Sequence, residues 1–301
     1  MYFNESTWKS EEQMTEKYDR TFRLGEYPVG KLLLEFSIPA IIAMIANALY
    51  NVVDSIFVGR GVGPLALTAV TIALPVMLIL MAFGMLVGIG ATALVSIRLG
   101  QGKPDEAEQI LGNAFSALVL LGIVISVSML LFLDSILMFL GATPDVFGYA
   151  KQFLSVILLC SVFQFISFGL NNVIRGEGNP MISMATMLFS AAMNTILNPI
   201  FIFVFHWGVR GSALATASTQ IAVSFFIVWH FTKGRSNLKL RRKNLVLRPR
   251  ILMMIFAIGL SPFLLQMAAG MAMFLFNHYL LIYGGEMAVA AMGVINRTVL
   301  M

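Results

Sequence analysis

Long apolar runs separated by short polar breaks set the pattern of this sequence. Each run has about 20 residues or more, which lets an α-helix cross a hydrocarbon core of ~30 Å. Every break contains Gly or Pro, residues that end helices. The pattern predicts spans over residues 32–58, 65–96, 111–133, 150–173, 181–205, 211–232 and 251–283, and the start of an eighth span at residue 287.

The composition agrees with this pattern. The 301 residues are 58% hydrophobic and 12% charged, and the mean hydropathy of +0.86 lies far above the range of a soluble domain. Residues 1–30 form a charged tail, and the first apolar run is too long for the core of a signal peptide. The sequence therefore predicts an all-α polytopic membrane protein with no cleaved leader.

The basic residues are distributed unequally between the two sides of the membrane. Most of the 20 Lys and Arg residues fall on the side of the N-terminal tail, eight of them in the stretch 233–250. The exceptions in loops are Arg60, Lys151 and Arg210. By the positive-inside rule, the N-terminus and the basic stretch are cytoplasmic, and we expect a multi-pass protein of the plasma membrane. Because these charges belong to loops, the net charge of +5 does not indicate nucleic-acid binding.

An internal repeat relates the last two spans to the first two. Ile38-Pro39 aligns with Ser261-Pro262, and GPLALTAVTI aligns further on with GEMAVAAMGV. Two copies of equal topology predict two six-helix lobes arranged as parallel repeats in the full protein, with the second copy incomplete at Met301. We therefore divide the chain into a tail (1–30), a first lobe (31–232), a basic linker (233–250) and the start of a second lobe (251–301).

Asp54 is the one carboxylate well inside an apolar span. A charged side chain at a helix centre costs about 2.5 to 3.5 kcal/mol on insertion scales, so such a residue is normally protonated, paired or facing a wet cavity. Burial disfavours the charged form of a carboxyl group, so Asp54 can exchange a proton, and a cation such as Na+ is the other partner it can hold. The alternative is an Asp that merely bonds a neighbouring helix.

Polar residues accompany Asp54 on one face of its helix. They have the spacing i, i+3, i+4, i+7: Asn47, Tyr50, Asn51 and Asp54. A stripe of this kind faces protein or water rather than lipid. We therefore expect Asn47, Tyr50 and Asn51 to line a cavity. Asn277 is a further candidate, because the repeat places it opposite Asp54.

A second polar group lies in the fifth and sixth spans. Asn194 and Asn198 are one helical turn apart, and Pro199 leaves a helix carbonyl without its usual donor, which favours a kink. These asparagines and Asp54 all fall in the outer half of the membrane, where Thr216 can reach the same cavity. The alternative is that paired asparagines hold helices together. Most other hydroxyls of the sixth span are interpreted as packing features: Ser212, Ser218 and Thr219.

The sequence contains none of the common catalytic or metal-binding signatures. We find no zinc-like spacing, nucleotide-binding loop or nucleophile constellation, so we expect neither an enzyme nor a bound cofactor, and no ATP site on this chain. The 20 Met residues adapt to irregular apolar cavities and give weak support to a promiscuous binding surface. No feature indicates an oligomeric state.

Four segments, taken in order, resemble a known family. IPAIIAMIANALYNVVDSIFVGR, RLGQGKPDEAEQ, RGEGNP and MNTILNPIFIF resemble the first lobe of the multidrug and toxic compound extrusion (MATE) transporters, and the resemblance covers about residues 32–301. It implies two six-helix lobes around a central cavity, alternating access, and antiport of organic cations against H+ or Na+. By position, it implies that Asp54 binds the coupling ion beside Asn194 and Thr216. Asn198 departs from the many relatives with Asp before this Pro, which leaves the coupling ion open.

The sequence thus predicts a secondary active multidrug exporter whose partners are the bilayer and small organic cations or amphipathic drugs. One alternative is a flippase for lipid-linked saccharides, which needs several cations in its cavity for phosphates, whereas only Arg297 lies within a predicted span. Another is a non-transporting receptor or scaffold. Such a protein would not need an acid at the same depth as an amide pair.

Overall fold

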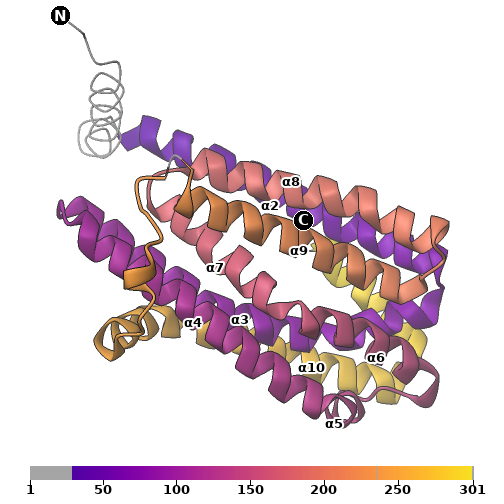
Figure 1. Ribbon diagram of the computed structural model, residues 1–301. Coiled ribbons are helices and arrows are strands. Elements are labelled where there is room, and N and C mark those ends of the chain that lie inside the picture. The colour runs from indigo at the N-terminus through magenta and orange to yellow at the C-terminus, as the bar shows by residue number, and fades with distance from the viewer. Residues whose placement is uncertain (1–28, 235, 300–301) are drawn as a thin grey trace, which may run out of the picture.

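The computed structural model describes residues 29–234 and 236–299, and in these ranges the chain is helical without strands (Figure 1). Short loops join the elements. These are α2 Val29–Gly61, α3 Pro64–Gly100, α4 Pro104–Leu131, α5 Leu133–Phe139, α6 Pro144–Leu159, α7 Ser161–Gly176, α8 Pro180–Pro199, the π-helical η1 Ile200–Val204, α9 Gly208–Thr232, the 3₁₀ turn η2 Arg242–Asn244 and α10 Pro249–Val299. Pro at the first position of α3, α4, α6 and α8 suits helix starts, where its missing N–H costs nothing.

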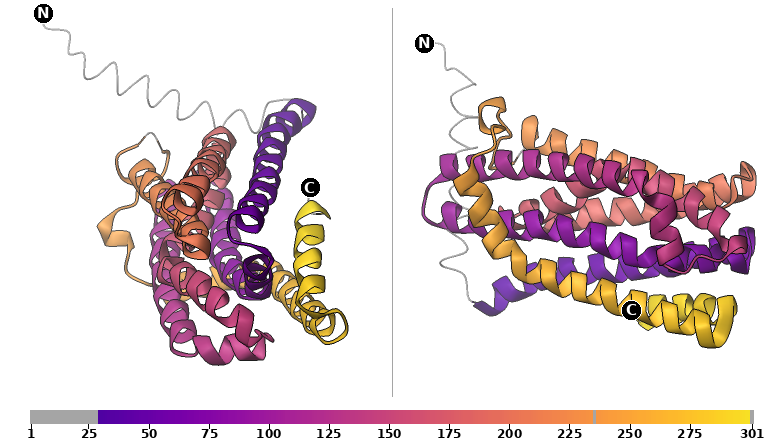
Figure 2. Two further views of the ribbon diagram at one scale, coloured as in Figure 1. Left: turned by 90° about the vertical axis from the view of Figure 1, so that its right-hand side faces the viewer. Right: turned by 90° about the horizontal axis from the view of Figure 1, so that it is seen from below.

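The membrane prediction is confirmed at the level of the fold. In the described part of the chain, six helices are long and apolar enough to cross a membrane, and a bent pair of helices raises this number to as many as seven. Viewed along the helices, α2 and α10 lie at one edge of the bundle (Figure 2). Both leave large apolar side chains exposed, among them Ile45 at 53% and Leu265 at 75%, as helices in contact with lipid or further protein do.

The predicted fourth span, 150–173, is not a single straight helix. It divides at Cys160 into α6 and α7, which are bent by 57° relative to each other. The Ser126 hydroxyl of α4 donates to the carbonyl of Leu158, and Ser161 donates to the Gly122 carbonyl at 3.4 Å. These tertiary contacts satisfy groups at the break and explain why apolar periodicity alone did not indicate it.

Two further breaks follow from single residues. After Pro199, α8 continues into the π-helical turn η1, because Pro supplies no N–H to the preceding turn. In α10, Gly285 has φ 68° and ψ −171°, a backbone conformation that Gly adopts readily and that separates 249–284 from 286–299. This break agrees with the predicted gap between the spans 251–283 and 287 onward. Thr143 donates to the Glu286 carboxylate, and Thr68 donates to the Glu286 carbonyl at 3.2 Å.

The helices pack as neighbours that are often distant in sequence. α2 lies against α8, and α3 lies between α7, α4 and α10 (Figure 1). α3 and α10 approach to backbone contact at two glycines: a Cβ at Gly90 would lie 2.0 Å from the Ile255 carbonyl oxygen, and a Cβ at Gly259 would lie 1.8 Å from the Leu86 carbonyl oxygen. Small residues thus fix α10 against the rest of the bundle.

The basic segment between α9 and α10 is folded onto one end of the bundle. We call this segment, residues 233–250, the strap. Its last two residues are the first two residues of α10. The backbone N–H of Lys239 donates to Glu108 Oε1 at 3.1 Å, and the Arg248 N–H donates to Asn113 Oδ1 at 2.6 Å. Both acceptors belong to α4. The strap is therefore a packed element rather than a loose connection.

Candidate functional site

Asp54 lies where three helices meet. It is on α2, 9% exposed, and its Oδ1 accepts hydrogen bonds from two neighbours. Ser212 of α9 donates from Oγ at 3.0 Å, and Asn198 of α8 donates from Nδ2 to the same oxygen. Donors to a buried carboxylate offset part of the cost of removing it from water.

A chain of side-chain hydrogen bonds leads from Asp54 across α8 to α9. The Nδ2 of Asn198 lies 3.5 Å from the Oδ1 of Asn194, and the Nδ2 of Asn194 donates to the Oγ1 of Thr216 at 3.1 Å. Both asparagines are buried, Asn198 completely. The structure therefore brings together the acid, the asparagine pair and Thr216, which the sequence placed at matching depth.

One atom in this series of hydrogen-bonded side chains has no hydrogen-bond partner. The Oδ1 of Asn198 is buried and accepts no hydrogen bond within the described part of the protein. A buried polar atom without a partner costs about 1–3 kcal/mol. The amide thus places a spare acceptor directly beside the carboxyl group of Asp54.

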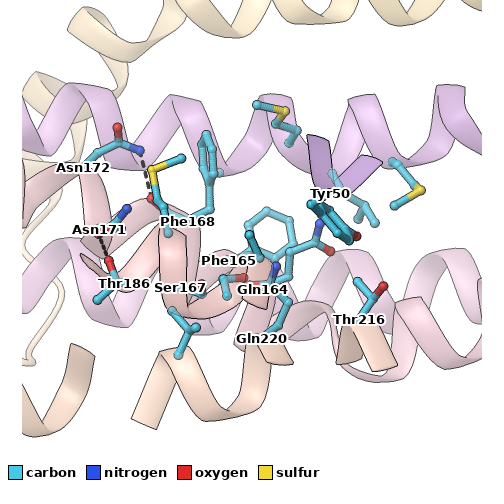
Figure 3. Close-up of a pocket in the computed structure, with 18 of the residues that line it drawn as sticks. Tyr50, Gln164, Phe165, Ser167, Phe168, Asn171, Asn172, Thr186, Thr216 and Gln220 are labelled. Atoms are coloured by element: carbon cyan, nitrogen blue, oxygen red, sulfur yellow. Dashed lines mark hydrogen bonds between the residues drawn. The ribbon is translucent and has the colours of Figure 1, made fainter. Parts of the chain in front are cut away.

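A cavity of about 330 Å³ opens next to this chain. Its wall is built by α2, α3, α7, α8 and α9 (Figure 3). Tyr50 and Thr216 lie toward one end of it, and Asn171 and Thr186 lie toward the other, where Thr186 donates to Asn171 Oδ1 at 2.7 Å. Because Thr216 is both on the wall and in the hydrogen-bond chain, the cavity and the buried acid are directly connected.

The cavity wall is amphipathic. Its apolar part includes the methionines 77, 81 and 187 and the rings of Phe165 and Phe168, and its polar part includes Gln164 and Gln220. Flexible thioethers and aromatic faces accommodate varied apolar and cationic shapes. The wall thus combines apolar and aromatic side chains with polar groups, and both kinds of contact are used by small-molecule sites.

Arg175 also lies on this wall, which the sequence did not predict. The predicted span ended at residue 173 and assigned Arg175 to the following loop, whereas α7 continues to Gly176. The RGEGNP motif therefore begins inside the helix, and its turn is made by Glu177 and Gly178. Arg175 is the one cation among the residues of the wall.

The remaining predicted residues fall into three groups. Tyr50 lies on the cavity wall. Asn277 is buried elsewhere: its Nδ2 donates to the Thr71 carbonyl of α3 at 3.1 Å, and it is not part of the wall. Asn47 and Asn51 lie on α2, but their side chains are outside the described part of the structure, as is the side chain of Arg297.

Ser212 is the functional candidate that sequence reasoning missed. It was interpreted as a packing residue among the small side chains of its helix, yet it contacts Asp54 directly. The available signal was its position four residues before Thr216, which places both hydroxyls on one face of α9. Only the packing of α9 against α2 gives that face its partner.

The sequence of this protein is similar to a known family and to known membrane proteins. The MatE family model matches residues 39–200. The multidrug export protein MepA of Staphylococcus aureus (strain MSSA476) is 31% identical over 287 residues, covering 94% of this chain and 62% of the relative. MepA of Staphylococcus haemolyticus (strain JCSC1435) is 30% identical over 283 residues with the same coverage. The chain thus spans less than two thirds of the length of these relatives.

Solved structures share the arrangement of helices. The MATE multidrug transporter DinF-BH, solved in complex with a dye, superposes with a TM-score of 0.87 at 37% identity, over 91% of this chain and 62% of that one. An outward-facing multidrug resistance MATE family transporter of the MOP superfamily superposes with a TM-score of 0.80 at 27% identity, over 92% of this chain and 65% of that one.

Proposed function

This chain belongs to the MatE family, and from that membership we propose that it forms part of a secondary active exporter of cationic or amphipathic drugs. In this proposal, residues 31–232 form the first six-helix lobe, residues 233–250 link the lobes, and residues 251–301 begin the second. The exporter resides in the plasma membrane with its N-terminus and strap in the cytoplasm. Export is driven by antiport of a coupling ion.

One observation carries this proposal: the hydrogen-bond chain from Asp54 through Asn198 and Asn194 to Thr216 on the cavity wall. It provides a physical link between an ionisable group and a binding cavity. A ligand in the cavity and an ion at Asp54 then act on the same set of side chains. Coupling requires only that the two favour different arrangements of that set.

The chain of hydrogen bonds can take two arrangements that differ by one proton. When Asp54 is charged, Asn198 and Ser212 donate to its Oδ1, and the structure shows both of these contacts. When Asp54 is protonated, its O–H becomes a donor and needs an acceptor, and the unpaired Oδ1 of Asn198 supplies one after the amide turns. Turning that amide takes Asn198 Nδ2 away from Asn194 Oδ1. The side chain of Asn194 then reorients, which changes its hydrogen bond to Thr216. The ion state of Asp54 is thus transmitted to the cavity wall.

We propose H+ as the coupling ion. Ser212 and Asn198 both donate to Asp54 Oδ1, and the unpaired Oδ1 of Asn198 beside them can accept the O–H of a protonated Asp54, so the site has a partner for the acid with and without its proton. A membrane potential adds about 2.3 kcal/mol per 100 mV for each net elementary charge moved, so it drives export of an uncharged amphipathic drug against one H+. A one-for-one exchange with a monovalent organic cation moves no net charge and is driven by the pH gradient alone. Na+ is the competing coupling ion, and a Na+ gradient is the second arm of the test.

The cavity supports organic cations and amphipathic molecules as substrates. Aromatic faces at Phe165, Phe168 and Tyr50 attract cations, and methionines adapt to apolar shapes. The dye bound in the DinF-BH structure is the corresponding precedent in a relative. A lipid-linked saccharide flippase is less well supported, because Arg175 is the one cation on the described cavity wall that could bind the phosphates.

The deciding experiment measures efflux of ethidium, a cationic dye, from membrane vesicles that contain the protein. A pH gradient and a Na+ gradient are imposed separately. We expect the wild-type protein to expel dye under the pH gradient and Asp54→Asn to bind dye without expelling it. Asp134→Asn is the matched control, because this acid is exposed and pairs with Lys151 at 2.7 Å.

Each outcome of this experiment is decisive. Gradient-driven efflux that persists in Asp54→Asn would refute the coupling role of this acid. Efflux that responds to the Na+ gradient alone would replace H+ by Na+. If the wild-type protein moves no cationic dye under either gradient, a receptor or scaffold becomes the better assignment.

A further inference from the structure

The strap divides its basic residues into two classes that the sequence cannot distinguish. Arg241 belongs to the fold: its Nε pairs with Glu108 Oε2 at 2.9 Å. Lys239 also belongs to it, because its Nζ donates to the Gly234 carbonyl oxygen. The second class includes Arg242, Lys243 and Arg250. All three are exposed, and no carboxylate of the described ranges forms an ion pair with them.

Several bonds to α4 hold the strap in one place. Ser116 Oγ donates to the Leu245 carbonyl at 2.7 Å, and Asn113 Nδ2 donates to the Asn244 carbonyl at 3.4 Å. The approach is close because α4 has a glycine there: a Cβ at Gly112 would lie 2.3 Å from the Asn244 carbonyl oxygen. The positions of the exposed cations are therefore fixed relative to the spans.

The starts of two apolar runs, on α4 and on α10, place the strap at the boundary of the hydrocarbon core. On α4, the last acidic residue before the apolar run is Glu108, and the strap contacts Asn113 and Ser116 within the first turns of that run. On the other side, the strap leads into α10 at Pro249, whose apolar run starts at Ile251. At 1.5 Å per residue, the start of α4 at Pro104 lies ~14 Å further from the membrane than Asn113.

The free cations of the strap therefore lie at the depth of the lipid headgroups. The headgroup regions add only about 5–8 Å on each side of the core, so a strap at the core boundary lies among the phosphates. Val246, between these cations and 69% exposed, adds an apolar group at the same place. Basic side chains with an apolar neighbour at this depth match an anionic lipid in both charge and polarity.

We propose that the strap binds anionic phospholipids of the adjacent leaflet, with Arg242, Lys243 and Arg250 contacting headgroup phosphates and Val246 contacting the acyl boundary. The strap joins the first lobe to α10, so bound lipid clamps this junction to the membrane surface. The proposal depends on the depth of the strap and not on transport. It holds for either coupling ion.

The test is native mass spectrometry of the detergent-solubilised protein titrated with phosphatidylglycerol and, separately, with phosphatidylcholine. The test variant is Arg242→Gln/Lys243→Gln/Arg250→Gln. The control variant removes the same charge from exposed residues outside the strap, on α2, α6 and α9: Arg60→Gln/Lys151→Gln/Arg210→Gln. Thermal unfolding midpoints of both variants establish that the fold is kept.

Each cation near an anionic surface changes affinity by about fivefold, so we expect phosphatidylglycerol to bind the test variant on the order of 100-fold more weakly than wild type. The control variant should keep the wild-type affinity, and phosphatidylcholine should bind all three proteins weakly. Equal affinity of wild type for the two lipids, or equal losses in the two variants, would overturn the proposal. Inorganic phosphate that displaces phosphatidylglycerol at equal concentration would also overturn it, in favour of a site for free phosphate.

Discussion

The side-chain amide of Asn194 donates to the hydroxyl of Thr216 at 3.1 Å, and this bond joins a buried acid cluster to an open cavity. On one side of the bond, Asn198 and Asp54 are buried. On the other, Thr216 is part of the cavity wall. An ionisable group can therefore influence a binding site that it does not itself line.

Thr216→Val tests this connection. Valine keeps the shape of the side chain but cannot accept the bond from Asn194, and a buried donor left unpaired costs about 1–3 kcal/mol. We expect gradient-driven dye efflux to fall about tenfold. Dye affinity, measured by fluorescence polarisation, should change by less than this, because valine keeps the shape of the cavity wall. Thr219→Val is the matched control, because this hydroxyl bonds the Ala215 carbonyl of its own helix. Equal effects of the two substitutions would contradict the prediction.

Ser212→Ala tests the donor that the sequence did not reveal. The change removes the hydrogen bond from Ser212 to Asp54 Oδ1, and a hydrogen bond to a charged group contributes about 1.5–3 kcal/mol. We expect efflux to fall by about tenfold or more, with dye affinity unchanged because Ser212 is not on the cavity wall. Ser224→Ala, on the same helix, should leave efflux unchanged, since Ser224 bonds the Ile221 carbonyl. A full rate of efflux in Ser212→Ala would show that this donor is dispensable.

Gly259→Ala tests the contact between α3 and α10. The added Cβ would lie 1.8 Å from the Leu86 carbonyl oxygen, a backbone atom that cannot move alone. Forcing the helices apart should cost about 1–3 kcal/mol or more, seen as a lower midpoint of thermal unfolding in detergent. A Cβ added at Gly59, which lies within α2, would meet no neighbouring atom within 4 Å. Gly59→Ala should therefore stabilise the protein by about 0.5–1 kcal/mol. A normal midpoint for Gly259→Ala would mean that the two helices are not held this closely.

Glu177→Ala tests how the strap is anchored. The buried Glu177 carboxylate bonds Nε2 of His230 at 3.1 Å and accepts a bond from the Ser236 hydroxyl near the start of the strap. Removing this acceptor should cost about 1–3 kcal/mol for each donor left behind and loosen the strap. Trypsin should then cleave after Arg242 or Lys243 at a higher rate. Glu106→Ala removes only exposed ion pairs and should leave the rate of cleavage unchanged.

The sequence located the spans because crossing a membrane requires long apolar helices whatever the tertiary fold. It did not locate the division of residues 150–173 into α6 and α7, because both halves are apolar. The hydroxyl of Ser126 on α4 and the carbonyl of Gly122 stabilise that break. The same limit applied to Arg175, whose helix continues beyond the apolar run.

The sequence indicated those residues of the candidate site that stand out by helical spacing alone. A lone intramembrane acid and two asparagines one turn apart stand out in an apolar background, so Asp54, Asn194 and Asn198 could be named from the sequence. Their order in the hydrogen-bond chain, the role of Ser212 and the cavity beside Thr216 depend on which faces of α2, α8 and α9 meet. The basic strap shows the same division. The sequence determined its charge, whereas only the folded chain decided that Arg241 pairs with Glu108 and that Arg242, Lys243 and Arg250 form no ion pair within the described residues. The physical reason is that pairing depends on distance in space rather than along the chain.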